Sequence, residues 1–236
     1  MIKTNYATSK KIIQQFSETP GFFIVGPIKT SSGYINPIYP ESRRTFSYPE
    51  RLQVVLDEIS KFLKKQKIKY DIICGGATCG IMLSSPLAMQ LGVKQLYVRQ
   101  HAKKAGMKFA VEGAYKKGER VVLIDDATAS GIHKVDFINN LRKVGLKVEW
   151  VIVPLSRNRN LEFDNAWVKK AKVKYQSFGD LHDIRKYSYK NGFITEEAYN
   201  IIGWYTDYPL DWFEDKEKWK YYLKYKRMKK KSISGV

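Results

Sequence analysis

Short apolar runs alternate with helical stripes of apolar residues through the middle of the chain. Arg120–Ile124 has almost no polar face, as expected of a strand at the centre of a parallel sheet. From Pro49 to Lys65 apolar residues recur at helical spacing, and proline suits the first position of a helix. Strands are predicted at 22–25, 70–74, 95–99, 120–124 and 147–155, and helices at 5–16, 49–65, 78–91, 131–144, 180–190 and 195–205. This alternation predicts an α/β fold with a mostly parallel central sheet flanked by helices.

Two stretches are too irregular to assign from the pattern. Residues 30–44 are rich in turn residues and are broken by Pro37 and Pro40, and residues 101–117 are polar and basic. No linker is evident before Pro209. The sequence therefore predicts one domain over residues 1–209 and a basic, aromatic-rich tail over residues 210–236 that is helical and then frayed.

The charge of the chain is strongly positive and uneven. Its 236 residues carry 42 Lys or Arg against 23 Asp or Glu, a formal net charge of +19. Such a balance suits nucleic acid, a membrane surface or phosphorylated small molecules. Nine of the cations lie in Lys216–Lys231, interleaved with Trp219, Tyr221, Tyr222 and Tyr225. This segment has two interpretations, an RNA-binding surface or a solvated amphipathic helix.

Composition narrows the class of protein. Hydrophobic residues make up 44% of the chain, which disfavours a disordered protein. No apolar run approaches the roughly 20 residues that cross a bilayer, and no apolar segment follows the first charges, so we expect a cytoplasmic protein. Cys74 and Cys79 lack the further ligands of a zinc site, because only three histidines exist. Two buried, reduced thiols are expected.

One segment carries specific chemistry. The apolar strand Val121–Ile124 is followed by Asp125-Asp126, then by five small residues ending at Gly131, then by a helix. Ligands bind at the carboxyl ends of parallel strands, and a loop that enters a helix exposes N–H groups to an anion. The two acids would accept hydrogen bonds from ribose hydroxyls while the loop holds a 5′-phosphate. The alternative is an ordinary turn in which Asp126 or Thr128 caps the helix.

With that segment, the chain resembles the type I phosphoribosyltransferases, and more closely the orotate phosphoribosyltransferases, over about residues 12–210. Thr30–Pro49 resembles the family's N-terminal Ser-Gly…Ser-Pro segment, Gly75–Ile81 its pyrophosphate loop, and Arg99–Gly113 its catalytic loop. Gly192–Glu197, within residues 180–202, is similar to its closing helices. The resemblance implies the type I phosphoribosyltransferase fold, with a small hood formed by about residues 1–48.

The resemblance also implies a reaction and its residues. Phosphoribosyl pyrophosphate (PRPP) would transfer its phosphoribosyl group to orotate, with Mg²⁺ as cofactor, giving orotidine 5′-monophosphate and pyrophosphate for pyrimidine synthesis. Mg²⁺ would arrive on PRPP near Asp125 and Asp126 rather than in a protein cage. A homodimer is implied, with the catalytic loop acting in trans. The implied site comprises catalytic Lys103, Arg99, Asp125 and Asp126; a phosphate loop of Ala127, Thr128, Ala129, Ser130, Gly131, Ile132 and His133; a pyrophosphate loop of Gly75, Gly76, Ala77 and Thr78; and Arg157, Asn36 and Tyr39 for orotate.

The chain departs from the family pattern at four positions. Ala129 replaces a threonine of the phosphate loop, Ile35 a lysine before Asn36-Pro37, Gln100 a basic residue, and Ala105 a histidine. Losing one hydroxyl-to-phosphate hydrogen bond should cost about 1.5–3 kcal/mol at most, which weakens binding without abolishing it. Two alternatives therefore stay open, a transferase for a purine or for uracil, and a PRPP-sensing regulator that binds nucleic acid.

Overall fold

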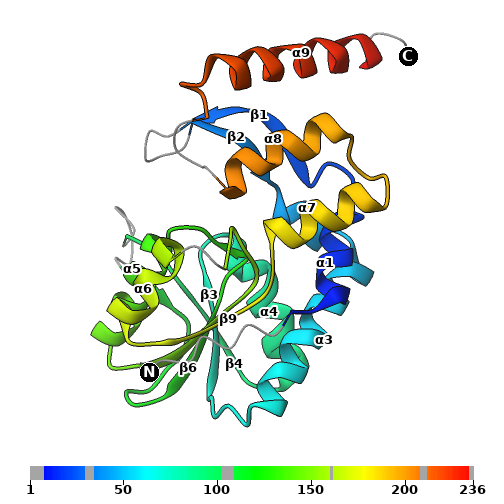
Figure 1. The fold of residues 1–236 in the computed structure, drawn as a ribbon. Coiled ribbons are helices and arrows are strands. Elements are labelled where there is room, and N and C mark those ends of the chain that lie inside the picture. Colours follow the sequence, from blue (N-terminus) through cyan, green and yellow to red (C-terminus); the bar gives the residue numbers. More distant parts are fainter. Residues whose placement is uncertain (1–7, 30–34, 102–108, 160–161, 208–211, 234–236) are drawn as a thin grey trace.

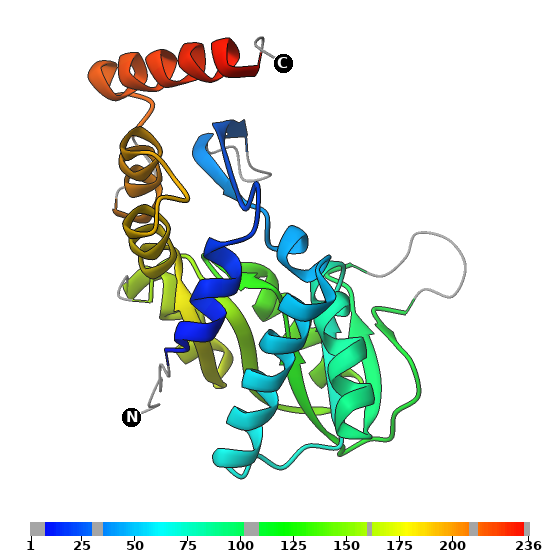
Figure 2. The same cartoon turned by 90° about the vertical axis from the view of Figure 1, so that its right-hand side faces the viewer.

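The structure, a computed structural model, describes residues 8–29, 35–101, 109–159, 162–207 and 212–233. A sheet with helices on both faces forms the larger part, and a smaller hood of strands and helices lies beyond one end of it (Figure 1). The view turned by 90° shows α9 (Lys216–Ile233) at the outer edge of this hood (Figure 2).

Over the described residues, the central sheet has seven strands in the order β5-β4-β3-β6-β8-β7, and β9 pairs with β8 on the side opposite β6 and β7. Every pairing is parallel except that of β4 with β5. The predicted α/β fold with a mostly parallel sheet is confirmed. The strands are β3 (Ile72–Gly76), β4 (Lys94–Val98), β5 (Val111–Glu112), β6 (Arg120–Ile124), β7 (Ala127–Thr128), β8 (Lys147–Ser156) and β9 (Lys174–Asp180).

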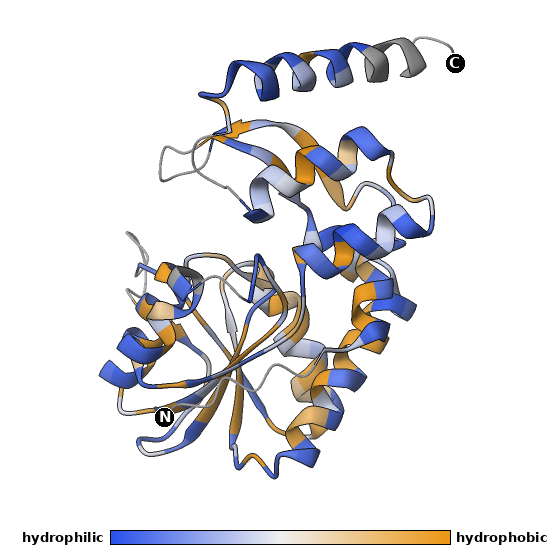
Figure 3. Ribbon diagram, viewed as in Figure 1, coloured by the Kyte–Doolittle hydropathy of each residue, from blue (hydrophilic) through white to orange (hydrophobic). Residues whose placement is uncertain are grey.

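Alternation along the buried strands divides the core into two layers, because successive strand side chains point to opposite faces. Val122 and Ile124 join the apolar cluster that includes α1 (Lys10–Ser17), α3 (Pro49–Lys65) and α4 (Cys79–Leu91). Val121 and Leu123 join the cluster that includes α5 (Ile132–Lys143) and α6 (Glu162–Ala171). Figure 3 shows the strands largely in hydrophobic colours, whereas α7 (Leu181–Lys190) and α9 are largely hydrophilic. A sheet covered on both faces explains why β6 has almost no polar side.

The hood is built around an antiparallel hairpin of β1 (Phe23–Lys29) and β2 (Ile35–Pro40), followed by α2 (Ser42–Phe46). α8 (Glu196–Asp207) packs against β2. Trp212 is fully buried, and its indole N–H donates to the carbonyl oxygen of Ile35 at 2.6 Å. Tyr222 and Tyr225 of α9 belong to the same apolar cluster as Trp212. The first turns of α9 are therefore anchored to the hood.

Several predicted boundaries agree with the structure and others do not. α3 and β6 begin and end at the predicted residues, but β2, α6 and β9 are absent from the prediction. Cys74 is buried as expected, whereas Cys79 is only half-buried because it opens α4 beside the loop; both thiols are free. No helix in the described ranges is long and apolar enough to span a membrane.

Gly131 is the position at which the fold most directly requires glycine. Its φ is +72°, and an added Cβ would lie 2.1 Å from the Trp167 ring. Gly92 has a similar φ of +67° but no atom within 4 Å of such a Cβ. We expect Gly131→Ala to lower the free energy of unfolding by about 2–4 kcal/mol, the sum of left-handed strain and overpacking. Gly92→Ala should show only the strain of about 1 kcal/mol. Urea denaturation measures both, and equal losses would show that the Trp167 contact is relieved without cost.

Candidate functional site

Between β3 and β6, the direction in which successive strands are added to the sheet reverses. The strand that follows β3 is β4, which pairs with one side of β3, whereas β8, the next strand to pair with β6, lies on the opposite side of β6 from β3. In open α/β sheets the crevice at such a switch point is where ligands bind. The loops Gly75–Thr78 and Asp125–Gly131 therefore start next to each other at the binding edge. The Ala77–Thr78 peptide bond is cis.

The two loops approach each other closely. A Cβ added to Gly80 would lie 2.5 Å from the carbonyl oxygen of Ile124 and 3.0 Å from Oδ1 of Asp125. A Cβ on Gly76 would lie 3.1 Å from Oδ2 of Asp125. Side chains at these two positions would displace the acid, so the glycines allow α4 to begin directly beside it.

Both carboxylate oxygens of Asp125 have partners within the protein. The residue is 6% exposed, and its Oδ1 accepts a hydrogen bond from the Asp126 N–H at 3.0 Å. Its Oδ2 forms a buried ion pair with the ammonium of Lys134, which is 7% exposed and lies in the first turn of α5. The sequence analysis missed Lys134. A lysine early in a helix gives no signal of burial, and only the return of the chain brings it onto β6.

Asp126 is the acid that faces the cavity. Its side chain retains some exposure there but is otherwise enclosed by protein. Burial, and then the negative charge of Asp125, raise the pKa of Asp126 above its ordinary value, while the Lys134 ammonium acts in the opposite direction. Because a buried carboxylate is costly without partners, hydroxyl donors or a cation from a ligand would stabilise its charged form.

A cavity of about 550 Å³ extends from Asp126 to the hood. It brings together residues that the sequence places in separate groups, namely those of the phosphate loop and those assigned to the base. The residues of these two groups that line the cavity are Asn36, Tyr39, Asp126, Ala127, Thr128, Ala129, Ser130, Gly131, His133 and Arg157. Lys29 and Lys134 add two further cations to the lining. The size suits a small, phosphorylated ligand.

Arg157 is a second buried cation of the cavity wall. It follows β8, is 9% exposed, and its backbone N–H donates to the carbonyl oxygen of Thr128 at 2.8 Å. Its guanidinium carbon lies 5.6 Å from the centre of the Tyr205 ring, which also lines the cavity. A planar, oriented guanidinium is suited to a carboxylate. Tyr39 of β2 also lines the cavity and is 39% exposed.

The loop after Asp126 offers hydroxyl groups despite Ala129. Thr128 is buried, and its Oγ1 has no hydrogen-bond partner among the residues described. Ser130 is exposed on the cavity wall, whereas Ile132 is 64% exposed and does not line the cavity. A buried hydroxyl without a partner is uncommon in folded proteins, so Thr128 is available to a ligand.

Other predicted site residues lie apart from this cavity. Arg99, at the end of β4, forms an ion pair with Glu112 at 3.7 Å and lies over the Tyr97 ring. Gln100 donates to Asp136 at 2.9 Å. Gly75, Gly76, Ala77 and Thr78 border the acids at the neighbouring loop but do not line the cavity. Lys103 and Ala105 lie outside the described residues.

The donor groups of the site fit a magnesium ion that arrives with its ligand. Within the described ranges, no group of three or more His, Cys, Asp or Glu side chains is arranged to hold a metal. Asp126 alone presents a carboxylate to the cavity, since Asp125 is paired with Lys134. One carboxylate together with phosphate oxygens of a substrate is a common set of ligands for Mg²⁺.

Comparison with known proteins supports the resemblance seen in the sequence. No protein-family model matches the chain. The orotate phosphoribosyltransferase of Cytophaga hutchinsonii is 25% identical over 186 residues, 79% of this chain and 88% of that protein. The crystal structure of orotate phosphoribosyltransferase from Aeropyrum pernix superposes with a TM-score of 0.63 at 25% identity, over 77% of this chain and 99% of that one.

A second solved structure, of Leishmania donovani UMP synthase, gives a TM-score of 0.71 at 27% identity and covers 83% of this chain. The chain spans only 41% of that protein. The expected fold and the expected similarity to orotate phosphoribosyltransferases are confirmed by these relatives.

The buried ion pair is open to a direct test. We expect Lys134→Met to lower the free energy of unfolding by about 3–5 kcal/mol, because it leaves the Asp125 carboxylate buried without a counter-charge. The double variant Asp125→Asn, Lys134→Met should recover most of this loss, since neither charge then remains. Denaturant titrations of both single variants and the double variant give the coupling energy. Additive losses would show that Lys134 does not neutralise Asp125.

Proposed function

We propose that this protein is an orotate phosphoribosyltransferase that acts in the cytoplasm in pyrimidine synthesis. It transfers the phosphoribosyl group of PRPP to orotate and releases orotidine 5′-monophosphate and pyrophosphate. The similarity to orotate phosphoribosyltransferases over about four-fifths of the chain supports this assignment. The observation that carries it is the cavity itself, in which the loop after Asp126 and the guanidinium of Arg157 face one ligand-sized space.

The reaction forms a bond between a ring nitrogen of orotate and the anomeric carbon of PRPP, and breaks the bond from that carbon to pyrophosphate oxygen. Positive charge develops on the ribose and negative charge on the leaving group. The protein therefore contributes mainly positioning and electrostatic stabilisation. Asp126 would accept hydrogen bonds from the ribose hydroxyls, and its charge would stabilise the cationic ribose.

The phosphate end of the substrate would lie on the loop that precedes α5. Thr128 Oγ1, the Ser130 hydroxyl and backbone N–H groups would donate to the 5′-phosphate, and the N-terminus of the helix adds positive potential. Arg157 would pair with the orotate carboxylate, with Asn36 and Tyr39 on the hood side of the base.

The pyrophosphate end would lie toward Gly75–Thr78, whose backbone borders Asp125. Mg²⁺ carried by PRPP would neutralise charge on the leaving group, and Asp126 would be its protein ligand. Arg99 and Lys103 would supply further cations to the pyrophosphate. Lys103 would come from the second subunit of a homodimer.

A panel of bases tests the substrate. Purified protein with PRPP and Mg²⁺ should consume orotate and release pyrophosphate, and should leave adenine, hypoxanthine and uracil unused. Arg157→Lys should raise KM for orotate at least tenfold and leave KM for PRPP nearly unchanged, because only the bidentate carboxylate contact is lost. Turnover of another base alone would replace orotate as the substrate. PRPP binding without turnover of any base would identify a ligand sensor.

Mixed dimers test the contribution of Lys103 in trans. Lys103→Ala and Asp126→Asn subunits should each be nearly inactive as homodimers. In a heterodimer one site would combine an intact Asp126 with an intact Lys103 from its partner, so about a quarter to a half of the wild-type activity should return. Differently tagged subunits, purified in two affinity steps, provide the mixed species. A verified heterodimer without activity would contradict the proposal.

A further inference from the structure

The apolar side of α9 is buried against the rest of the protein. Tyr222 and Tyr225 are 2% and 6% exposed and belong to the apolar cluster that also holds Trp212. The chain from Lys216 to Lys231 nevertheless carries nine Lys or Arg and a single acid, Glu217. The remaining surface of the helix is therefore dominated by positive charge, beyond what anchoring the helix requires.

Within the described residues, the protein neutralises few of these cations. Lys218 forms an ion pair with Asp215 at 3.5 Å. Across the described part of the chain, no ion pair or hydrogen bond is formed by the side chains of Lys216, Lys220, Lys224, Lys226 and Arg227. Three of them follow one another at intervals of four residues, an arrangement of like charges that destabilises a helix. An anionic partner would relieve this repulsion.

Aromatic surface is exposed beside the cations. Trp219 is 37% exposed, although its ring lies 5.8 Å from that of Trp212 and 5.6 Å from that of Tyr222. Packing on these two rings fixes the orientation of the indole while part of it remains open. Leu223, one turn further on, is 36% exposed.

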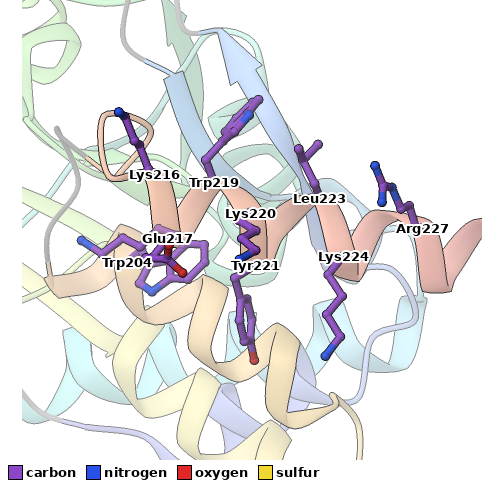
Figure 4. A pocket seen from close by; sticks show the side chains of 10 residues that line it. Trp204, Lys216, Glu217, Trp219, Lys220, Tyr221, Leu223, Lys224 and Arg227 are labelled. Carbon is purple, nitrogen blue, oxygen red and sulfur yellow. The ribbon is translucent and has the colours of Figure 1, made fainter.

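An open groove of about 760 Å³ runs along this part of α9 (Figure 4). Trp204 of α8 and Tyr221 of α9, whose rings are in contact, line its side toward α8. The lining also includes Trp219, Lys220, Lys224 and Arg227 of α9. Figure 4 shows Trp219 and Leu223 on one side of the helix and Tyr221 and Lys224 on the other, so the lining wraps around α9. Aromatic rings and cations thus both contribute to the lining of the groove.

We propose that this face of α9 binds single-stranded nucleic acid. Phosphates would contact the stripe of Lys216, Lys220, Lys224 and Arg227, and a base would stack on the open part of Trp219. Combining a cationic groove with aromatic platforms is how proteins hold single strands without reading their sequence. The proposal is independent of the transferase activity, because none of these residues lines the cavity beside Asp126.

Two other occupants fit the surface less well. A helix that lies on a membrane needs a continuous apolar face to insert. In α9 that face is buried in the hood, and over residues 216–227 the exposed large apolar side chains are those of Trp219 and Leu223. A second copy of the same helix would bring two cationic stripes together and increase the repulsion. A flexible polyanion with flat, apolar bases matches both the charge and the aromatic surface.

The test uses the full-length protein and a fluorescein-labelled oligouridylate of 20 nucleotides, with fluorescence anisotropy as the measurement. Binding should weaken with salt with a slope of about −0.7 per phosphate contacted, or about −3 for four contacts. The triple variant Lys216→Gln, Lys220→Gln, Lys224→Gln should reduce the magnitude of the slope by about 2 and weaken binding at least tenfold. The matched control removes the same charge elsewhere, through glutamine at the exposed positions Lys64, Lys65 and Lys69. This control should bind almost as the wild type does.

Trp219→Leu separates stacking from charge, since leucine keeps apolar bulk and removes the π face. It should weaken binding about tenfold at an unchanged salt slope. Equal weakening by the two triple variants would overturn the proposal, because binding would then follow net charge alone. So would equal affinity for duplex RNA or heparin, or tighter binding to phosphatidylserine vesicles. Thermal melting of each variant verifies that it is folded.

Discussion

The ion pair between Asp125 and Lys134 is the interaction on which the candidate site depends. It joins the end of β6 to the first turn of α5 and so closes the loop between them. Taking both charges out of water is expensive, and the pair is tolerated because each ion satisfies the other and Asp125 also accepts the Asp126 N–H. The two adjacent acids thereby acquire different roles. Asp125 holds the loop, and Asp126 faces the cavity.

The same pair changes the electrostatics of the proposed phosphate site. A phosphate dianion beside two free carboxylates would be repelled by both. Lys134 cancels one of these charges, and Lys29 and Arg157 add further positive charge to the lining of the cavity. A second neighbouring constraint is steric. Gly76 and Gly80 keep the adjacent loop close to Asp125, and this closeness places the two predicted loops at one switch point.

The sequence predicts those parts of the fold whose signals are local. β6 is uninterrupted and apolar, and α3 combines a proline at its start with a regular stripe, so both are predicted to the residue. β2 is hidden by Pro37 and Pro40, which a hairpin at the edge of the hood tolerates. β9 is hidden by Gln176 and Ser177, polar residues that are fully buried in the sheet with their side chains hydrogen-bonded. Local patterns cannot show partners that distant segments provide.

In the candidate site, too, residues with local signals can be predicted and residues that depend on distant contacts cannot. The acids and the small loop are contiguous, so their chemistry is readable from spacing, and the family resemblance adds Arg157 and the hood residues. Lys134 depends on a contact across nine residues that exists only once the helix has folded back, so the sequence alone cannot assign it. This ion pair also bears on phosphate binding by a loop that has Ala129 in place of a hydroxyl residue. Thr128 retains a buried hydroxyl without a partner in the described structure, and Lys134 lowers the negative charge that a phosphate would meet. A loop that lacks one hydroxyl donor but presents less negative charge to its ligand is consistent with continued binding of phosphate.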